Sequence, residues 1–304
     1  MTVLATDRPW IAWTGMETDL IFNQGVELPG FAAFPMIDSA EGRARLARYY
    51  AELIAIGAET GAGILLDTPT WMANPDRAAV VGYAAEDLPR VTRAAVALAR
   101  EAAGAAGAVA TRVSVQIGPR GDGYRPGMAA AETSAAYHRP QIEAARAAGA
   151  DLVSAYTLGA VGEALGIARA AAAAGLPALI SYTVETDGRL ADGTALGAAV
   201  EALAEGAAPA AIMVNCAHPD HIARAFDGGA WQGLLAGVVA NASRRSHAEL
   251  DASETLDAGD PDELAEQLAA LAGPLPALAV FGGCCGTDLR HLRAAAGRLA
   301  ARRG

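Results

Sequence analysis

The chain has 304 residues, of which 53% are hydrophobic and only 5% aromatic, and its formal net charge is −11. This content is sufficient for one large core, since α/β barrels commonly form single domains of about 250 residues. Phosphate binding needs clustered Lys and Arg, so the acidic balance argues against a nucleic-acid partner. No break in composition divides the chain, and residues 1–304 are interpreted as one domain.

Short β-rich runs alternate with long alanine-rich segments along the chain. Strands are predicted at residues 10–13, 64–67, 112–117, 152–156, 178–183, 211–215, 234–240 and 277–281. Helices are predicted at residues 41–56, 88–103, 135–148, 161–174, 195–206, 219–226, 261–271 and 288–302. Short apolar runs are typical of strands buried on both faces of a parallel sheet. The pattern favours an α/β fold, a (β/α)8 TIM barrel with parallel strands; an open doubly wound sheet is the alternative.

Two segments indicate where the catalytic face lies and whether the chain crosses a membrane. Residues 67–84, rich in Pro, Asn, Asp and Gly, follow the second predicted strand and would form a βα loop on the catalytic face of a barrel. The longest uncharged stretch, residues 267–287, is broken by Pro274 and Pro276, so we expect no membrane span. No secretory signal is apparent, and the low, odd cysteine count indicates reduced thiols and a cytoplasmic protein.

All three cysteines stand at the ends of predicted strands. Cys216 directly follows the sixth strand, and Cys284 and Cys285 lie side by side between glycines after the eighth. In a barrel these positions meet at the carboxyl ends of the strands, where barrel enzymes have their active sites. A catalytic zinc ion takes tetrahedral ligands and keeps one position open for substrate. The trio therefore predicts a zinc site with three thiolates, although a single buried Cys is often only a small hydrophobe.

Such a site suits chemistry on a thiol. A free thiol has a pKa of about 8.5, and zinc coordination deprotonates a bound thiol while leaving lone pairs for attack. Methyl transfer from a sulfonium or quaternary ammonium donor then needs the reactants within about 3–3.5 Å of each other. No general base is required, which agrees with the absence of a convincing acid/base pair in the sequence.

The cysteine motifs resemble those of the homocysteine S-methyltransferase family, and the resemblance covers nearly the whole chain. Further similar segments are residues 14–18, 68–71, 185–193 and 215–219. The resemblance implies a (β/α)8 barrel enzyme, a methyltransferase that uses zinc to move a methyl group to homocysteine or a related thiol. It also implies a role in methionine biosynthesis. The partners would be a small-molecule thiol and a small methyl donor, and an oligomer is not excluded.

Two positions depart from the family pattern. The family usually opens its first motif with Asp, and it often has Glu before the Thr that follows strand four. This chain has Trp13 and Tyr156 at those positions. In the family these carboxylates commonly hold the amino group of homocysteine. We therefore expect homocysteine to be a poor acceptor compared with a thiol whose amino-acid head is absent or differently presented.

Nine residues are predicted to contact substrate. They are Trp13, Met16, Glu17, Thr18, Trp71, Tyr156, Asn215, Asn241 and His247. Trp71 either offers its face to a cationic donor, an attraction worth about 0.5–2 kcal/mol, or only packs its own loop. The strand-end Asn215 and Asn241 bind either substrate or loop backbone. His247 either contacts substrate or belongs to a solvated polar loop, residues 241–251.

Two other kinds of function stay as alternatives. One is a metal-dependent barrel hydrolase, in which zinc activates water; such sites favour His and carboxylate ligands, and no His-x-His motif occurs here. The other is a catalytically altered thiol-binding or redox-sensing protein. A vicinal Cys284–Cys285 disulfide would be strained. His218, which precedes Pro219 at a predicted helix start, is interpreted as a packing or capping residue and not as a ligand.

Overall fold

Eight parallel strands close into a barrel in the computed structural model, which describes residues 4–5, 7–127 and 130–301. Each strand pairs with its sequence neighbours, and β8 closes the ring against β1. The strands are β1 (Trp10–Ile11), β2 (Gly63–Asp67), β3 (Thr111–Ile117), β4 (Leu152–Leu158), β5 (Ala178–Tyr182), β6 (Ala211–Asn215), β7 (Leu235–Ala240) and β8 (Val280–Gly283). The predicted (β/α)8 barrel is confirmed, and the open sheet is excluded.

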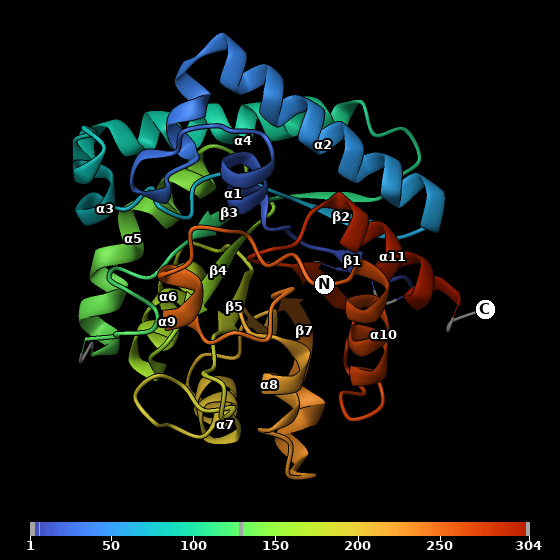
Figure 1. Cartoon of the computed structure of the whole chain (residues 1–304). Helices are drawn as coiled ribbons and strands as arrows, with labels where there is room; N and C mark the ends of the chain where they lie inside the picture. The colour runs from blue at the N-terminus through green and yellow to red at the C-terminus, as the bar shows by residue number, and fades with distance from the viewer. Residues whose placement is uncertain (1–3, 6, 128–129, 302–304) are drawn as a thin grey trace.

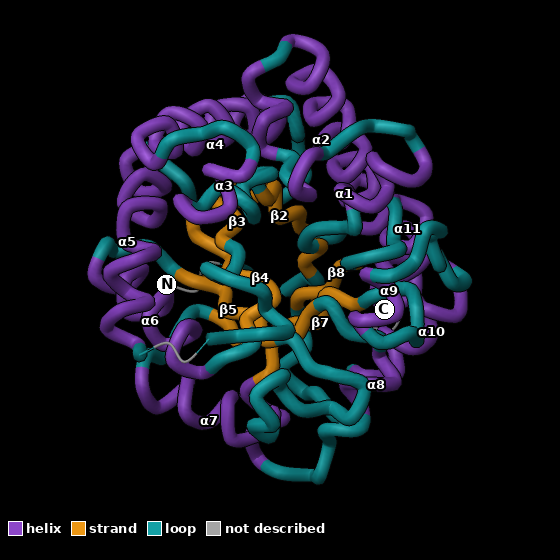
Figure 2. The backbone as a smooth tube through the Cα atoms, turned by 60° about the vertical axis from the view of Figure 1, so that its left-hand side comes forward, coloured by secondary structure: helices purple, strands orange, loops and turns teal. Residues whose placement is uncertain are grey.

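Helices surround this ring, as Figure 2 shows. They are α1 (Met16–Thr18), α2 (Ala40–Thr60), α3 (Pro75–Val80), α4 (Leu88–Gly104), α5 (Ala131–Ala147), α6 (Val161–Ala173), α7 (Leu196–Gly206), α8 (Pro219–Ala223), α9 (His247–Asp251), α10 (Pro261–Leu271) and α11 (Leu289–Ala301). Local sequence explains several ends. The Ser39 side chain accepts from Gly42 N–H at the start of α2, and Gly61 ends that helix with a φ of 75°. Figure 1 shows α2 and α4 side by side along one side of the barrel.

The structure corrects several predicted bounds. Strand β1 ends at Ile11 and not at residue 13, and β8 begins at Val280 because the chain after Pro276 turns, with Leu278 N–H donating to the Leu275 carbonyl. Short helices also form where only loops were predicted, namely α1, α3 and α9. The predicted end of the last helix, residue 302, lies outside the described residues. None of the described helices has both the length and the hydropathy of a membrane span.

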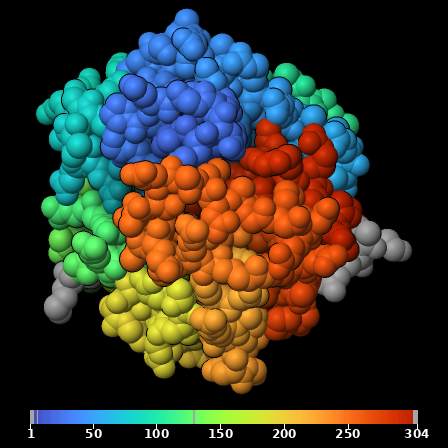
Figure 3. Space-filling view, viewed as in Figure 1, coloured from blue at the N-terminus to red at the C-terminus, as the bar shows by residue number. Residues whose placement is uncertain are grey.

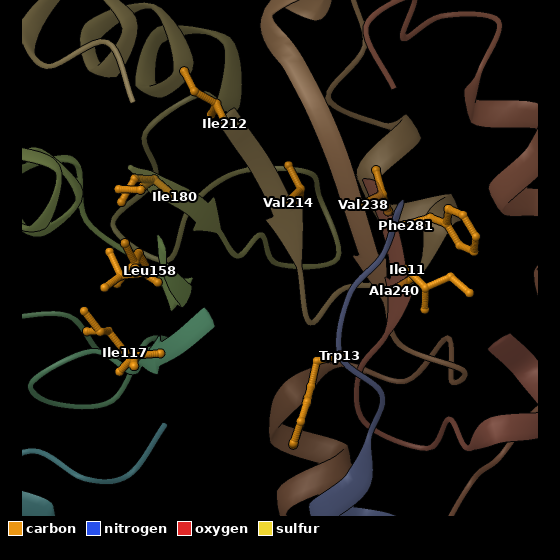
Figure 4. Close-up of a cluster of buried hydrophobic side chains, with 14 of the residues drawn as sticks. Ile11, Trp13, Ile117, Leu158, Ile180, Ile212, Val214, Val238, Ala240 and Phe281 are labelled. Atoms are coloured by element: carbon orange, nitrogen blue, oxygen red, sulfur yellow. The ribbon is translucent and has the colours of Figure 1, made fainter. Parts of the chain in front are cut away.

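The side chains of the strands alternate between two apolar layers. Ile64, Val153 and Val214 pack outward against the helices, and Figure 4 shows Val214 among other members of this outer layer. Leu65, Leu152 and Met213 belong to a second cluster that fills the barrel interior. This alternation follows from the two-residue period of a strand. The interior is therefore a packed core over most of its length, and a pocket borders the carboxyl ends of the strands.

A buried polar group lies just below that space. The Asp67 side chain is fully buried at the end of β2, where one carboxylate oxygen accepts from the Tyr156 hydroxyl at 3.0 Å. Ser114 and Ser154 share a hydrogen bond of 2.6 Å beside it. Burial disfavours the charged form and raises the pKa of Asp67 to about 7, although hydrogen bonds from Ser114, Tyr156 and Ser154 oppose this rise. The Tyr156 ring thus separates a buried carboxyl from the space above it.

Candidate functional site

The three cysteines meet at the carboxyl ends of β6 and β8. The Cys216 sulfur lies 2.9 Å from that of Cys284 and 3.8 Å from that of Cys285. All three Sγ atoms lie within 4.8 Å of one another, and within the described residues they are the only His, Cys, Asp or Glu group found with a metal-binding arrangement. Residues 68 and 69 positions apart in the sequence are therefore brought together, as the barrel prediction requires.

Backbone hydrogen bonds to β7 align the two cysteine loops. Cys216 N–H donates to the Val239 carbonyl, Cys284 N–H donates to the Ala240 carbonyl, and the Cys285 carbonyl accepts from Ala242 N–H. Because β7 lies between β6 and β8, the same strand positions both loops. The Cys284 loop also packs against Gly15, so tightly that a Cβ atom on residue 15 would lie 2.2 Å from the Cys284 carbonyl oxygen. Only glycine fits this approach.

Cys216 adopts a left-handed backbone conformation with a φ of 57°. Two side chains bind its carbonyl oxygen: the Tyr124 hydroxyl donates at 2.7 Å, and the Asn241 amide donates at 3.0 Å. Thr183 in turn donates to the Tyr124 hydroxyl at 2.9 Å. Non-glycine residues in this region cost about 1–3 kcal/mol and persist where the surroundings hold them. These bonds hold Cys216 with its sulfur toward the other two cysteines.

Hydrogen bonds join the Cys216 sulfur to those of Cys284 and Cys285. Hydrogen bonds from Cys284 and then Cys285 lower the pKa of the Cys216 thiol well below its ordinary value. The hydrogen bond with Cys216 conversely raises the pKa of Cys284 and of Cys285 well above the ordinary value. One thiolate is therefore favoured, and three adjacent thiolates would repel one another unless a cation compensates them.

The donor set fits zinc. Three thiolates in a tetrahedron with Zn–S distances of about 2.3 Å have their sulfur atoms about 3.8 Å apart. The Cys216–Cys285 separation has this value, whereas the Cys216–Cys284 separation is shorter. Within the described part of the chain, no carboxylate or imidazole joins the group as a fourth ligand.

A small cavity, here called the inner pocket, opens from the cysteines into the mouth of the barrel and has a volume of about 70 Å³. The cysteines form one side, and the opposite side consists of Trp13, Glu17, Trp71, Tyr156 and Phe31. The pocket also borders Thr18 and Asn215, so six of the nine predicted substrate residues other than the cysteines converge here. What they bind remains a prediction.

A larger cavity of about 530 Å³, the outer pocket, lies above the cysteines and also borders Cys216 and Cys285. Its walls include Phe22 from the N-terminal segment, Tyr124 from the loop after β3, and His247 and Leu250 from α9. Figure 3 shows the segment near residue 250, in orange, directly against the blue N-terminal segment on this face. Trp71, Phe31 and Thr18 border both pockets, so the two spaces adjoin.

The remaining predicted residues have different surroundings. Met16 is buried in the outer apolar layer and borders neither pocket, so its predicted contact with substrate is not supported. Asn241 borders the outer pocket and binds the Cys216 carbonyl. Asn215 accepts from Thr157 N–H at 2.8 Å and donates to the Thr157 hydroxyl at 2.9 Å. Asn241 thus binds loop backbone, which was one of its two predicted roles, whereas Asn215 binds the end of β4.

Histidine does not join the cysteine cluster. His247 is the first residue of helix α9 and does not lie in the polar loop that was one of its predicted settings. Its ring stacks on that of Tyr124, with the ring centroids 3.5 Å apart. His218 is buried and caps α8 by accepting from Asp220 N–H at 3.1 Å, as predicted. Burial lowers the pKa of His218 to about 4. Among the described residues, no imidazole offers a fourth ligand.

Sequence reasoning missed several residues of the site, among them Tyr124, Phe31 and Thr157. Tyr124 approaches Cys216 from a position 92 residues earlier in the chain. Phe31 and Thr157 border both pockets, and both have a positive φ, 60° and 63° respectively. A β-branched residue in this region is a genuine outlier, and Asn215 holds it there by two hydrogen bonds. The Tyr156-Thr157 pair, noted only for its departure from the family, was the available signal for Thr157.

Comparisons with known proteins agree with this geometry. The homocysteine methyltransferase MmuM from Escherichia coli matches in its metallated form at 24% identity and a TM-score of 0.72, covering 97% of this chain and 96% of that one. Its oxidized form matches with a TM-score of 0.74, also at 24% identity and with coverage of 97% and 96%. These likenesses show the shared fold. No curated protein matches the chain.

The family comparison covers most of the chain, including all three cysteines. The family model described as homocysteine S-methyltransferase matches residues 31–299. The match therefore extends from the N-terminal segment that borders the pockets to the last helix. The chain is thus a methyltransferase and belongs to the homocysteine S-methyltransferase family.

Proposed function

We propose that this enzyme is a zinc-dependent S-methyltransferase that acts on a small thiol. The observation that carries the proposal is the convergence of three cysteine sulfurs beside two adjoining pockets, with no His, Asp or Glu of the described residues joining them. Cys216, Cys284 and Cys285 would hold the zinc ion, and the open ligand position would take the substrate sulfur. When bound, zinc supplies the positive charge that favours a thiolate at neutral pH.

The chain's residues would place two reactants on either side of the cysteines. The inner pocket suits the thiol because it is small and enclosed by aromatic rings that exclude water. The outer pocket suits the donor, a sulfonium or quaternary ammonium compound, because it is larger and its lining includes the aromatic residues Trp71 and Tyr124. Aromatic faces attract such cations by about 0.5–2 kcal/mol.

The reaction balances without a protein acid or base. The donor's methyl carbon forms a bond with the thiolate sulfur while its bond to the donor sulfur or nitrogen breaks. The electron pair of that bond leaves with the donor, which becomes a neutral thioether or tertiary amine. The thiol proton is lost to solvent when the thiolate forms. With homocysteine as acceptor the product would be methionine, so a role in methionine biosynthesis depends on that acceptor.

A hydrolase is less well supported. Zinc hydrolases commonly use His and carboxylate ligands, because several thiolates donate so much charge that a bound water is acidified less. The described metal-binding group contains neither. A redox-sensing protein would need no adjoining pockets for two substrates, and two are present.

The proposal is tested by measuring zinc content and methyl transfer on the same preparation. We expect about one zinc ion per chain and methyl transfer to thiols from sulfonium or quaternary ammonium donors such as trimethylsulfonium or glycine betaine. Removal of zinc with a chelator should abolish transfer, and zinc addition should restore it. Bound zinc with ester hydrolysis but no methyl transfer would favour the hydrolase. Full activity without zinc would refute the proposal.

A further inference from the structure

The inner pocket has an unusual charge composition. Glu17 is the only carboxylate among its described lining residues, and no Lys, Arg or His borders it. The Glu17 side chain extends from α1, and the residue is only 8% exposed. Apart from the cysteines, Glu17 is therefore the one described lining residue that can carry a charge near neutral pH, and that charge is negative.

The protein gives this carboxylate little compensation. One of its oxygens accepts from the Trp13 indole N–H at 3.3 Å, and no basic side chain among the described residues forms an ion pair with it. A buried carboxylate is costly unless it is paired and hydrogen-bonded. An apolar residue, such as its neighbour Met16, would pack α1 without the free-energy cost of burying a carboxylate.

The other buried acid near the site is not available to a ligand. Asp67 lies under the Tyr156 ring, which donates its hydroxyl to the Asp67 carboxylate at 3.0 Å, and Asp67 does not border the pocket. Three aromatic residues, Trp13, Trp71 and Tyr156, line the pocket together with Glu17. A carboxylate surrounded by aromatic rings is an environment that stabilises a cation.

We propose that Glu17 binds the ammonium group of the acceptor thiol, so that the inner pocket selects small cationic aminothiols. This inference rests on the proposed function, which places the thiol sulfur at the cysteines. The small volume restricts the acceptor to a short molecule, and the absence of a basic lining residue disfavours an acceptor that carries a carboxylate. Glu17 is thus a specificity-determining residue for the acceptor.

Three thiols of similar size test the proposal, because they differ mainly in charge. They are 2-aminoethanethiol, which is cationic, 2-mercaptoethanol, which is neutral, and 3-mercaptopropionate, which is anionic. With the zinc-loaded enzyme and one fixed donor, we expect kcat/KM to fall in that order. The cationic thiol should exceed the neutral one by about 10- to 100-fold, the value of a charge-assisted hydrogen bond.

The Glu17→Gln variant isolates the charge. Glutamine keeps the size of the side chain and an oxygen that accepts from the Trp13 indole, so the local fold is retained. The matched control is Asp19→Asn, two positions later, whose carboxylate accepts from Asn23 and Gln24 and borders neither pocket. We expect Glu17→Gln to raise KM for 2-aminoethanethiol by about 10-fold or more, with little change for 2-mercaptoethanol. Asp19→Asn should leave all three thiols unchanged.

The outcomes separate this inference from the proposed function. If the wild-type enzyme methylates neither these three thiols nor homocysteine with any donor, the proposed function fails. If it methylates homocysteine but none of the three, the inference alone is wrong. If it methylates all three and Glu17→Gln lowers kcat/KM equally for each, Glu17 has a structural role and the inference is wrong. If the variant raises KM for the donor and not for the aminothiol, the carboxylate serves the donor, and the inference is also wrong. Calorimetric titration with 2-aminoethanethiol, without donor, gives a second readout that does not depend on turnover. We expect weaker binding by Glu17→Gln than by the wild type and by Asp19→Asn; equal binding by all three would contradict the inference.

Discussion

The two sides of the inner pocket are built in different ways. The cysteine side is formed by residues that directly follow β6 and β8, and hydrogen bonds to β7 align both loops. The opposite side is formed by Trp13, Glu17, Phe31 and Trp71, which come from two different loop regions, with Tyr156 from β4. The positions on the cysteine side follow from barrel closure, whereas those on the opposite side depend on how loops pack.

This difference indicates how such a site can change. Side-chain substitutions on the loop side can alter the acceptor without removing a metal ligand, because none of the three cysteines belongs to that side. Among the residues that border both the inner and the outer pocket are Phe31, Thr157 and Cys216. All three have a positive φ, the left-handed backbone conformation. Strain of this kind is typical of functional sites. The cysteine side should therefore determine whether transfer occurs, and the loop side should determine to which thiol.

The largest effect is expected on the cysteine side. Replacing Cys285 by Ser removes one of the three proposed zinc ligands, and we expect zinc content well below one per chain. Activity should fall by more than about 100-fold, since loss of even an outer-shell partner of a metal ligand costs about 10–100-fold. Metal analysis after dialysis and methyl-transfer assays measure both, and circular dichroism checks the fold. Full zinc occupancy in the variant would contradict the ligand assignment.

On the loop side, the identity of the acceptor should change by a smaller factor. The described residues that line the inner pocket include no Lys, Arg or His that could pair with the α-carboxylate of homocysteine, a group that 2-aminoethanethiol lacks. We expect 2-aminoethanethiol to be preferred over homocysteine by about 10-fold or more in competition, because each lost charge-assisted bond costs about 1.5–3 kcal/mol. Should homocysteine win by about 100-fold, other residues must hold its amino-acid head, and this prediction is wrong.

Below the loop side, Asp67 should make stability depend on pH. Its pKa is raised from 3.8 to about 7 by burial, so between those values the folded state binds a proton that the unfolded state releases. The free energy of unfolding must then decrease as pH rises through this range. Relative to Asp67→Asn, wild-type stability should fall by an amount on the order of 1–3 kcal/mol from pH 5 to pH 8.

Urea unfolding of both proteins at several pH values measures this difference. The comparison with the variant matters because burial also raises the pKa of Glu17 to about 7, which adds a slope of the same sign to both proteins. The Glu17 contribution cancels when the variant is subtracted. A pH-independent difference would show that Asp67 is not protonated in the folded state near neutral pH.

The smallest effect is expected for the histidines. His247→Ala removes the stack on Tyr124, worth about 0.5–1.5 kcal/mol, and His218→Ala removes a helix cap outside both pockets. Both variants should keep activity to within about tenfold, and the wild type should remain active below the free-thiol pKa of about 8.5. A loss of several orders of magnitude with zinc retained would reveal a general base that the proposed mechanism lacks.

The order of strands and helices was the most predictable part of the molecule. Apolar runs separated by alanine-rich segments predicted eight βα units, and the bounds of β6 and α10 agree with the structure residue by residue. Errors arose where local signals compete. Residues 277–279 are apolar enough for a strand but follow two prolines and turn instead. Residues 241–251 are polar enough for a loop, yet Ser246 and Glu249 form a capping box that begins α9.

By itself, the sequence determined the barrel and the cysteine cluster, because a closed parallel sheet brings the carboxyl ends of β6 and β8 together whatever the loops do. Only the tertiary structure decided that Glu17 borders the inner pocket while Met16, one residue earlier, packs into the core. It also decided that Tyr124 reaches the Cys216 carbonyl and that Phe31 and Thr157 take conformations their side chains disfavour. The physical reason is that loop conformations are selected by contacts between distant segments, which can outweigh local backbone preference, whereas strand pairing follows from the periodicity of the chain itself.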